Sequence, residues 1–142
     1  MKYFVNVIIV SVFFLFLTGM SSLSGNSPEK IPLPEKKFMA TFIDQSDIVT
    51  ECRNVSIEGA TFISGKRGEG TFTIPFENLT SISFLYSEGK LKGFVKLRSG
   101  PSIELILKKD DKAYGRTRYG NYQVKLIDLQ KMIMGGSLQK QG

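Results

Sequence analysis

Apolar and polar residues alternate one for one along several short stretches of this 142-residue chain. Phe72, Ile74 and Phe76 form one such series, and residues 95–97, 103–107 and 122–126 form others. A period of two is typical of β-strands with one buried and one wet face. Turn signals rich in glycine, proline or aspartate separate the stretches at about ten-residue spacing. We therefore predict an all-β fold, a small antiparallel sandwich or barrel with at most short helical turns.

The sequence also predicts an internal repeat at an offset of 50 residues. Residues 70–84 align without a gap with residues 120–134, and their apolar positions coincide. Two related β units follow from this, about 39–89 and 90–138; chance agreement between alternating patterns is the alternative. Units of this size are marginal alone, so we expect one shared core.

One segment of the second unit has a helical alternative. Asp128 is placed to cap a turn that runs through Leu129, Met132 and Ile133. The matching segment of the first unit, residues 78–82, predicts a turn that leads into a strand. We expect no more than a single helical turn at each place.

The first 24 residues have the three parts of a secretory signal peptide. Lys2 supplies the positive charge, residues 7–20 form an apolar run, and Ser22 and Ser24 precede a cleavage site at Gly25. The apolar run is short for a transmembrane helix, which needs about 20 residues. We therefore expect an extracytoplasmic chain, periplasmic or secreted. The alternative is an uncleaved segment that anchors the chain to the membrane.

The remaining boundaries follow from composition. Three prolines in residues 25–37 predict an extended linker. The β domain then covers residues 38–134, and the polar residues 135–142 form a flexible tail.

The chain contains no histidine and one cysteine, Cys52. The lack of histidine excludes the Ser-His-Asp triad, the Cys-His dyad and imidazole metal ligands. One thiol cannot close an internal disulfide, so we expect the core to hold the fold and Cys52 to be buried in it. Asp44 and Asp47 fall short of the spacing of a calcium loop. We expect no enzymatic activity, no cofactor and no metal; an enzyme that works without histidine is the less favoured alternative.

Charge is distributed unevenly along the chain. Residues 25–89 hold six Lys/Arg against nine Asp/Glu, whereas residues 90–142 hold twelve against four. Alternation places several of the basic side chains, and one aromatic, on outward strand faces. The candidate residues for binding an anion or a partner are Lys92, Phe94, Lys96, Arg98, Arg116 and Arg118. An ordinary solvated strand face is the alternative.

These features predict an exported, non-catalytic binding or assembly module of the bacterial cell envelope. The expected partner is an acidic envelope polymer, an anionic lipid or an acidic protein, and nucleic acid is disfavoured because the chain is exported. Membrane contact is expected if the signal is uncleaved. The alternative is a self-assembling structural component in which the acidic half of one copy meets the basic half of another. The sequence predicts no oligomeric state.

Overall fold

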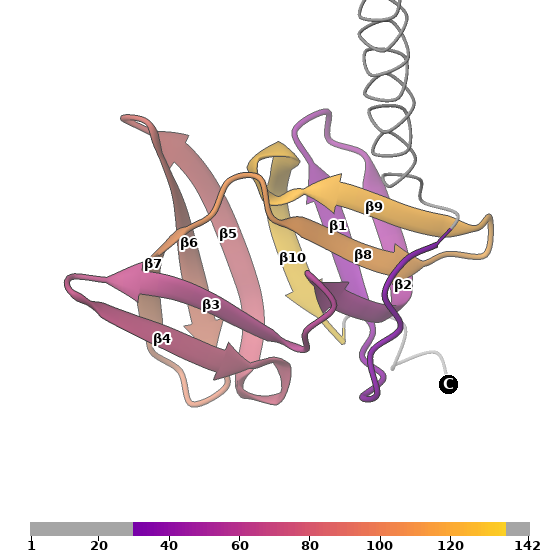
Figure 1. Ribbon diagram of the computed structural model, residues 1–142, viewed down its shortest axis with the longest axis horizontal. Helices are drawn as coiled ribbons and strands as arrows, with labels where there is room; N and C mark the ends of the chain where they lie inside the picture. The colour runs from indigo at the N-terminus through magenta and orange to yellow at the C-terminus, as the bar shows by residue number, and fades with distance from the viewer. Residues whose placement is uncertain (1–29, 136–142) are drawn as a thin grey trace, which may run out of the picture.

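The computed structural model describes residues 30–135, in which ten β-strands form a single antiparallel sheet (Figure 1). The sheet curls into a half-barrel around one core, so the prediction of an antiparallel all-β fold is confirmed. The strands are β1 (Ala40–Asp44), β2 (Val49–Ile57), β3 (Phe62–Arg67), β4 (Gly70–Pro75), β5 (Leu79–Ser87), β6 (Lys90–Leu97), β7 (Ser102–Leu107), β8 (Lys112–Arg116), β9 (Asn121–Lys125) and β10 (Leu129–Met134).

The helical content of the described residues consists of two single turns of 3-10 helix. They are η2 (Phe76–Asn78), between β4 and β5, and η3 (Leu126–Asp128), between β9 and β10. The prediction of at most one helical turn at each of these places is confirmed. No helix within residues 30–135 is long and apolar enough to cross a membrane. The predicted signal peptide, its cleavage site and the predicted tail from residue 136 onward lie outside the described residues.

The order of strands across the sheet is β4-β3-β7-β6-β5-β10-β1-β2-β8-β9. Strands β1 and β2, from the first half of the sequence, therefore lie between β10 and β8, from the second half (Figure 1). Because the halves are interleaved in this way, the acidic and basic halves of the sequence do not form an acidic lobe and a basic lobe.

The strand order has an internal regularity. Each of β1–β5 has a counterpart five strands later along the chain, so that β1 corresponds to β6 and β5 to β10. When every strand in the order is replaced by its counterpart, the result is the same order read from the opposite end of the sheet. Two backbone hydrogen bonds follow the same correspondence. The amide of Phe76 donates to the carbonyl of Thr61 (3.0 Å), and 50 residues later the amide of Leu126 donates to the carbonyl of Asp111 (2.8 Å). Both correspondences agree with an offset of 50 residues. The repeat of two related units nevertheless remains a prediction.

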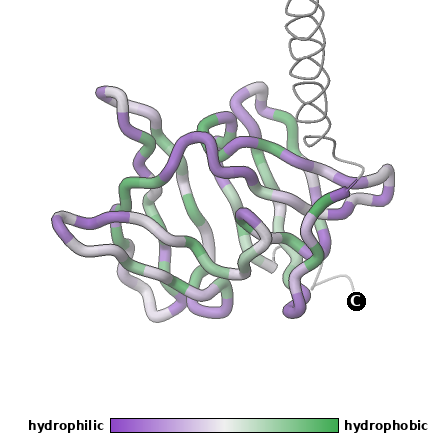
Figure 2. Tube along the Cα trace, in the orientation of Figure 1, coloured by the Kyte–Doolittle hydropathy of each residue, from purple (hydrophilic) through white to green (hydrophobic). Residues whose placement is uncertain are grey.

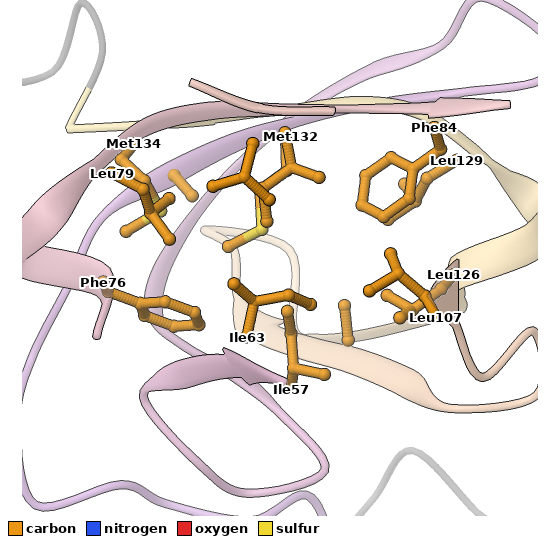
Figure 3. Close-up of a cluster of buried hydrophobic side chains, with 14 of the residues drawn as sticks. Ile57, Ile63, Phe76, Leu79, Phe84, Leu107, Leu126, Leu129, Met132 and Met134 are labelled. Atoms are coloured by element: carbon orange, nitrogen blue, oxygen red, sulfur yellow. The ribbon is translucent and has the colours of Figure 1, made fainter. Parts of the chain in front are cut away.

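The concave face of the sheet encloses one hydrophobic core. Figure 3 shows two groups of apolar side chains pointing toward each other, with Leu79 and Met132 among one group and Ile57 and Ile63 among the other. Hydrophobic segments lie in the middle of the strands, and several hairpin tips are hydrophilic (Figure 2). The largest fully buried side chains are Phe42, Phe76, Ile63, Leu79, Ile82, Leu91, Leu105, Leu126, Leu129, Met132, Val55 and Val95.

The helical alternative for residues 129–133 is wrong. These residues belong to β10, which pairs with β1 on one side and β5 on the other. Asp128 does not begin a helix; it is the last residue of η3. A central strand satisfies its backbone hydrogen bonds on both edges, and this long-range pairing outweighs the local capping signal.

The alternation also places Phe72 on a buried face, but 44% of Phe72 is exposed. Its neighbours in the series, Ile74 and Phe76, are buried as expected. Phe72 differs because β4 is the outermost strand of the sheet and pairs only with β3 among the described strands. An edge strand has a neighbour to cover its side chains on one side only.

Close packing of β8 against β2 requires a glycine at position 115. A Cβ atom there would lie 2.6 Å from the Cβ and 2.9 Å from the Sγ of Cys52. Real Cβ atoms do not approach other atoms this closely, so a side chain at this position forces the two strands apart. Gly70, by contrast, has ordinary space: a Cβ there would lie 3.8 Å from the nearest atom, the carbonyl oxygen of Arg67.

We expect Gly115→Ala to lower the free energy of unfolding by about 1–3 kcal/mol, the usual cost of overpacking a core. The midpoint of urea denaturation, followed by circular dichroism, measures this change. Gly70→Ala is the matched control and should leave the midpoint nearly unchanged. Equal midpoints for the two variants would show that β8 does not pack on β2 as described.

Candidate functional site

Four of the six predicted binding residues lie on or next to β6. Lys92, Phe94 and Lys96 point away from the core, opposite in direction to the buried Leu91 and Val95. Phe94 is 38% exposed. Arg98 follows the strand and is exposed. We call these four residues the β6 face.

The β6 face is partly neutralised by β7. Glu104 lies opposite Phe94 in the β6–β7 register, and its carboxylate forms an ion pair with the Lys92 Nζ (3.9 Å). Strand β6 is also an interior strand, paired with β5 and β7, so its lysines do not protect a sheet edge.

The other two predicted residues, Arg116 and Arg118, lie elsewhere. Strand β8 is five strands from β6 in the sheet, a distance of about 24 Å along its surface at ordinary strand spacing. The predicted residues therefore lie in two separate groups.

Arg116 and Arg118 line a pocket of about 1100 Å³ together with a third arginine, Arg53. Arg53 is on β2 and lies directly opposite Arg116 in the β2–β8 register. We call this site, defined by the three arginines, the arginine pocket. Sequence reasoning missed Arg53, because it belongs to the acidic half of the chain and only the pairing of β2 with β8 brings it to Arg116.

A β-bulge in β2 follows Arg53 directly. The register with β8 shifts between Arg53 and Ser56, and Asn54 has a positive φ of 51°. Asparagine is one of the few residues that tolerate this left-handed conformation. The amide of Val55, within the bulge, donates to the carbonyl of Phe38 (3.2 Å). Bulges of this kind change the direction of a side chain and often lie next to functional sites.

The β8–β9 hairpin carries Arg118 on an ordered turn. The hydroxyl of Thr117 donates to the carbonyl of Gly120 (2.9 Å) and accepts from the amides of Tyr119 (2.9 Å) and Gly120 (3.1 Å). Gly120 has a φ of 145°, which favours glycine. These bonds fix the direction in which Arg118 and Tyr119 leave the turn.

Arg118 and Tyr119 contact each other on this turn. The guanidinium of Arg118 donates to the hydroxyl oxygen of Tyr119 (3.1 Å) and lies 5.2 Å from the centre of its ring. The hydrogen bond to Tyr119 and the electrostatic interaction with Tyr119 raise the pKa of Arg118, and the charge of Glu51 adds a smaller contribution in the same direction. Arg118 is therefore a permanent cation. Glu51 also lines the pocket, so the lining has three arginines and one carboxylate.

Two features of Arg116 are unfavourable for the stability of the fold. Like charges directly opposite each other on paired strands are destabilising, and Arg116 faces Arg53 in this way. The Nε of Arg116 is also buried without a hydrogen-bond partner in the described structure. An orphaned buried donor costs about 1–3 kcal/mol. Buried donors of this kind are usually satisfied by an ordered water, an ion or another polar group.

The rest of the lining contains apolar and aromatic residues beside the polar Thr50, Thr117 and Asn121. Ile48 and Val49 are 58% and 60% exposed, and Tyr119 is 86% exposed. Tyr122, also part of the lining, packs on Phe42 of the core with ring centres 5.6 Å apart. Burial raises the pKa of Tyr122, which stays a neutral phenol. The pocket thus combines a fixed aromatic wall with a group of cations.

Carboxylates do not form a metal site in the described part of the chain. No group of three or more Cys, Asp or Glu side chains there is placed to hold a metal ion. Asp44 instead accepts hydrogen bonds from the amides of Ser46 (2.8 Å) and Ile48 (3.0 Å), and Asp47 accepts from the side chain of Gln130. Both carboxylates shape the β1–β2 turn.

Cys52 is a buried free thiol, as expected. Its exposed fraction is zero, and burial raises its pKa to about 12. A reactive cysteine needs an exposed, low-pKa thiol. Cys52 has neither property and acts as a small apolar core residue under Gly115.

We expect a maleimide reagent at about pH 8 to leave Cys52 of the folded chain unlabelled and to label it after denaturation. Intact mass measures the extent of labelling. Rapid labelling of the folded chain would contradict the described packing of β8 on β2.

Cys52 also gives a pH dependence with a defined sign. Above the ordinary thiol pKa of 9.0 the unfolded state loses its proton while the folded state keeps it, so stability falls as pH rises toward about 12. Cys52→Ala should remove this part of the alkaline loss of stability.

The described residues define an antiparallel all-β domain with a cationic, partly aromatic pocket. Residues 34–137 match the model of a family described as "Uncharacterised protein", and the chain belongs to this family. No curated protein and no solved structure matches the chain.

Proposed function

We propose that this chain is an exported, non-catalytic binding module of the bacterial cell envelope that holds an anionic ligand or an acidic partner in the arginine pocket. The observation that carries the proposal is the placement of Arg53 opposite Arg116 on paired strands, with Arg118 in the lining of the same pocket. Export and an envelope location rest on the predicted signal peptide at residues 1–24.

Arginine side chains favour particular anions. The planar guanidinium can bind a carboxylate, phosphate or sulfate through two parallel hydrogen bonds. Neither Arg53 nor Arg116 belongs to the ion pairs formed within residues 30–135, which are Lys36–Glu77 and Lys92–Glu104. Arg53 is exposed, so its guanidinium can be reached by an incoming anion.

The chemistry absent from the pocket supports binding over catalysis. The chain has no histidine, and the one cysteine is buried beneath β8. Glu51 is the one carboxylate of the lining.

The β6 face is a second candidate for the same ligand class. Its Phe94, Lys96 and Arg98 are exposed, but Glu104 offsets the charge of Lys92. The arginine pocket is preferred because its cations lie around one concavity, whereas the β6 face follows a convex strand surface.

We expect the double variant Arg53→Gln/Arg116→Gln to lose most of the binding that wild type shows toward an anionic probe. Each lost charged hydrogen bond removes about 1.5–3 kcal/mol of binding energy, which is roughly tenfold or more in affinity. The probes are phosphatidylglycerol vesicles, polygalacturonate and polyglutamate, measured by co-sedimentation or titration calorimetry at low and high salt.

The matched control is Lys96→Gln/Arg98→Gln, which removes two positive charges from the β6 face. It should bind nearly as well as wild type. Arg53→Lys keeps the charge but loses the paired hydrogen bonds, so an intermediate loss would indicate bidentate recognition. Salt-insensitive binding, or equal losses in both double variants, would refute a site at the arginine pocket; no binding to any probe would refute the proposed function.

A further inference from the structure

The free edge of β4 carries neither the charges nor the bulges that normally protect a sheet edge, and its one protecting residue is Pro75 at the end of the strand. Gly70–Pro75 pairs with β3 on one side, and no other strand of the described chain pairs with it. None of its six residues is charged, and the first four are exposed. Natural edge strands are usually blunted by lysine or other charges, by bulges or by a covering segment. The other outermost strand, β9, carries the exposed Lys125.

The register of the β3–β4 hairpin determines which backbone groups of β4 face outward. Arg67 pairs with Gly70 across the two-residue turn Gly68–Glu69, where Gly68 has a positive φ of 61°. The pair that closes a two-residue turn is hydrogen-bonded, and bonding alternates from there. The amides and carbonyls of Gly70, Phe72 and Ile74 therefore face β3, and those of residues 71 and 73 face solvent.

Pro75 limits the outward-facing edge at its end. Its backbone would also point outward, but proline has no N–H to donate. The pairing edge of β4 therefore consists of Thr71 and Thr73, with two donors and two acceptors placed symmetrically about Phe72.

This symmetry matches a second copy of the same strand. In an antiparallel pair related by a two-fold axis at Phe72, Thr71 of one copy lies opposite Thr73 of the other, and each such pair exchanges two hydrogen bonds. The two Phe72 rings, each 44% exposed, then lie side by side on the same sheet face.

We propose that β4 is a self-pairing edge through which two copies of this chain join their sheets around a two-fold axis at Phe72. The interface needs no rearrangement of the hairpin, because β3 already holds β4 in an extended conformation. It places no like charges opposite each other along the new strand pair. This interface is independent of the arginine pocket, which lies at the opposite end of the strand order.

Sedimentation equilibrium of the chain purified after full-length expression tests the proposal. We expect twice the monomer mass at high protein concentration. Thr71→Lys/Thr73→Lys should return the mass to that of a monomer, because each lysine then opposes a lysine of the second copy. Ser64→Lys is the matched control: Ser64 faces Thr73 on β3 and is exposed, yet lies one strand inside the edge, so its dimer should persist.

Cross-linking tests the register separately. Phe72→Cys places two thiols at the two-fold axis, where mild oxidation should give a covalent dimer. Thr73→Cys places its thiols diagonally and should cross-link far more slowly. Cys52 does not interfere, because it is buried.

Three outcomes would overturn the proposal. They are a wild-type monomer at every concentration, a dimer that survives the double lysine substitution in a folded chain, and faster cross-linking at position 73 than at position 72. None of these outcomes changes whether Arg53→Gln/Arg116→Gln binds more weakly than Lys96→Gln/Arg98→Gln, so the two proposals fail separately.

Discussion

The pairing of β5 with β10 is the contact on which the rest of the structure depends. It joins two groups of five strands into one sheet, and Ile82 and Met132 lie opposite each other at its centre, both fully buried. Each such side chain contributes about 1.5–3 kcal/mol when removed from water. Neither group of strands covers its own apolar face, so the shared core exists only while these two strands remain paired. The short turns η2 and η3 bury Phe76 and Leu126 against the same core and direct the chain into β5 and β10.

Strands were predictable from the sequence because alternation is a local property. Which strands lie side by side was not, since β10 pairs with β1 across about ninety residues and no local signal encodes that partner. The same long-range pairing explains the failed expectation at Leu129–Met134, where a plausible cap at Asp128 was overridden by two neighbouring strands. The exposure of Phe72 was missed for a related reason: alternation assigns a face, but position in the sheet decides whether that face is covered. Pro75 was a readable signal, because proline in a strand indicates an edge.

Some features of the candidate site were likewise predictable from local sequence, and others depend on which strands are neighbours. Alternation along β6 correctly placed Lys92, Phe94 and Lys96 on an outward face, but Glu104, on the next strand, changes the charge of that face. Arg53 required two facts that only the fold supplies: the adjacency of β2 and β8, and the bulge at Asn54. A composition argument divided the chain into an acidic and a basic half, whereas strand interleaving places an arginine of the acidic half against two of the basic half.

The two ends of the strand order carry different chemistry on the same scaffold. At the 50-residue offset, Gly65 and Gly115 both lie where a side chain would collide with the core, so these positions serve the fold. The hairpin tips differ: Arg118 and Tyr119 occupy one, and Gly68 and Glu69 occupy the other. The pocket therefore belongs to one end of the sheet and the uncharged edge to the other.

Joining two copies through β4 would leave both pockets open at opposite ends of the combined sheet. A polymer that carries repeated anionic groups would then meet two sites at once, and its avidity could exceed the affinity of either pocket without any new contact. A small anion would gain nothing from the second site. Affinity would then increase with ligand length only because β4 joins two copies, even though the ligand touches only the arginines of the two pockets.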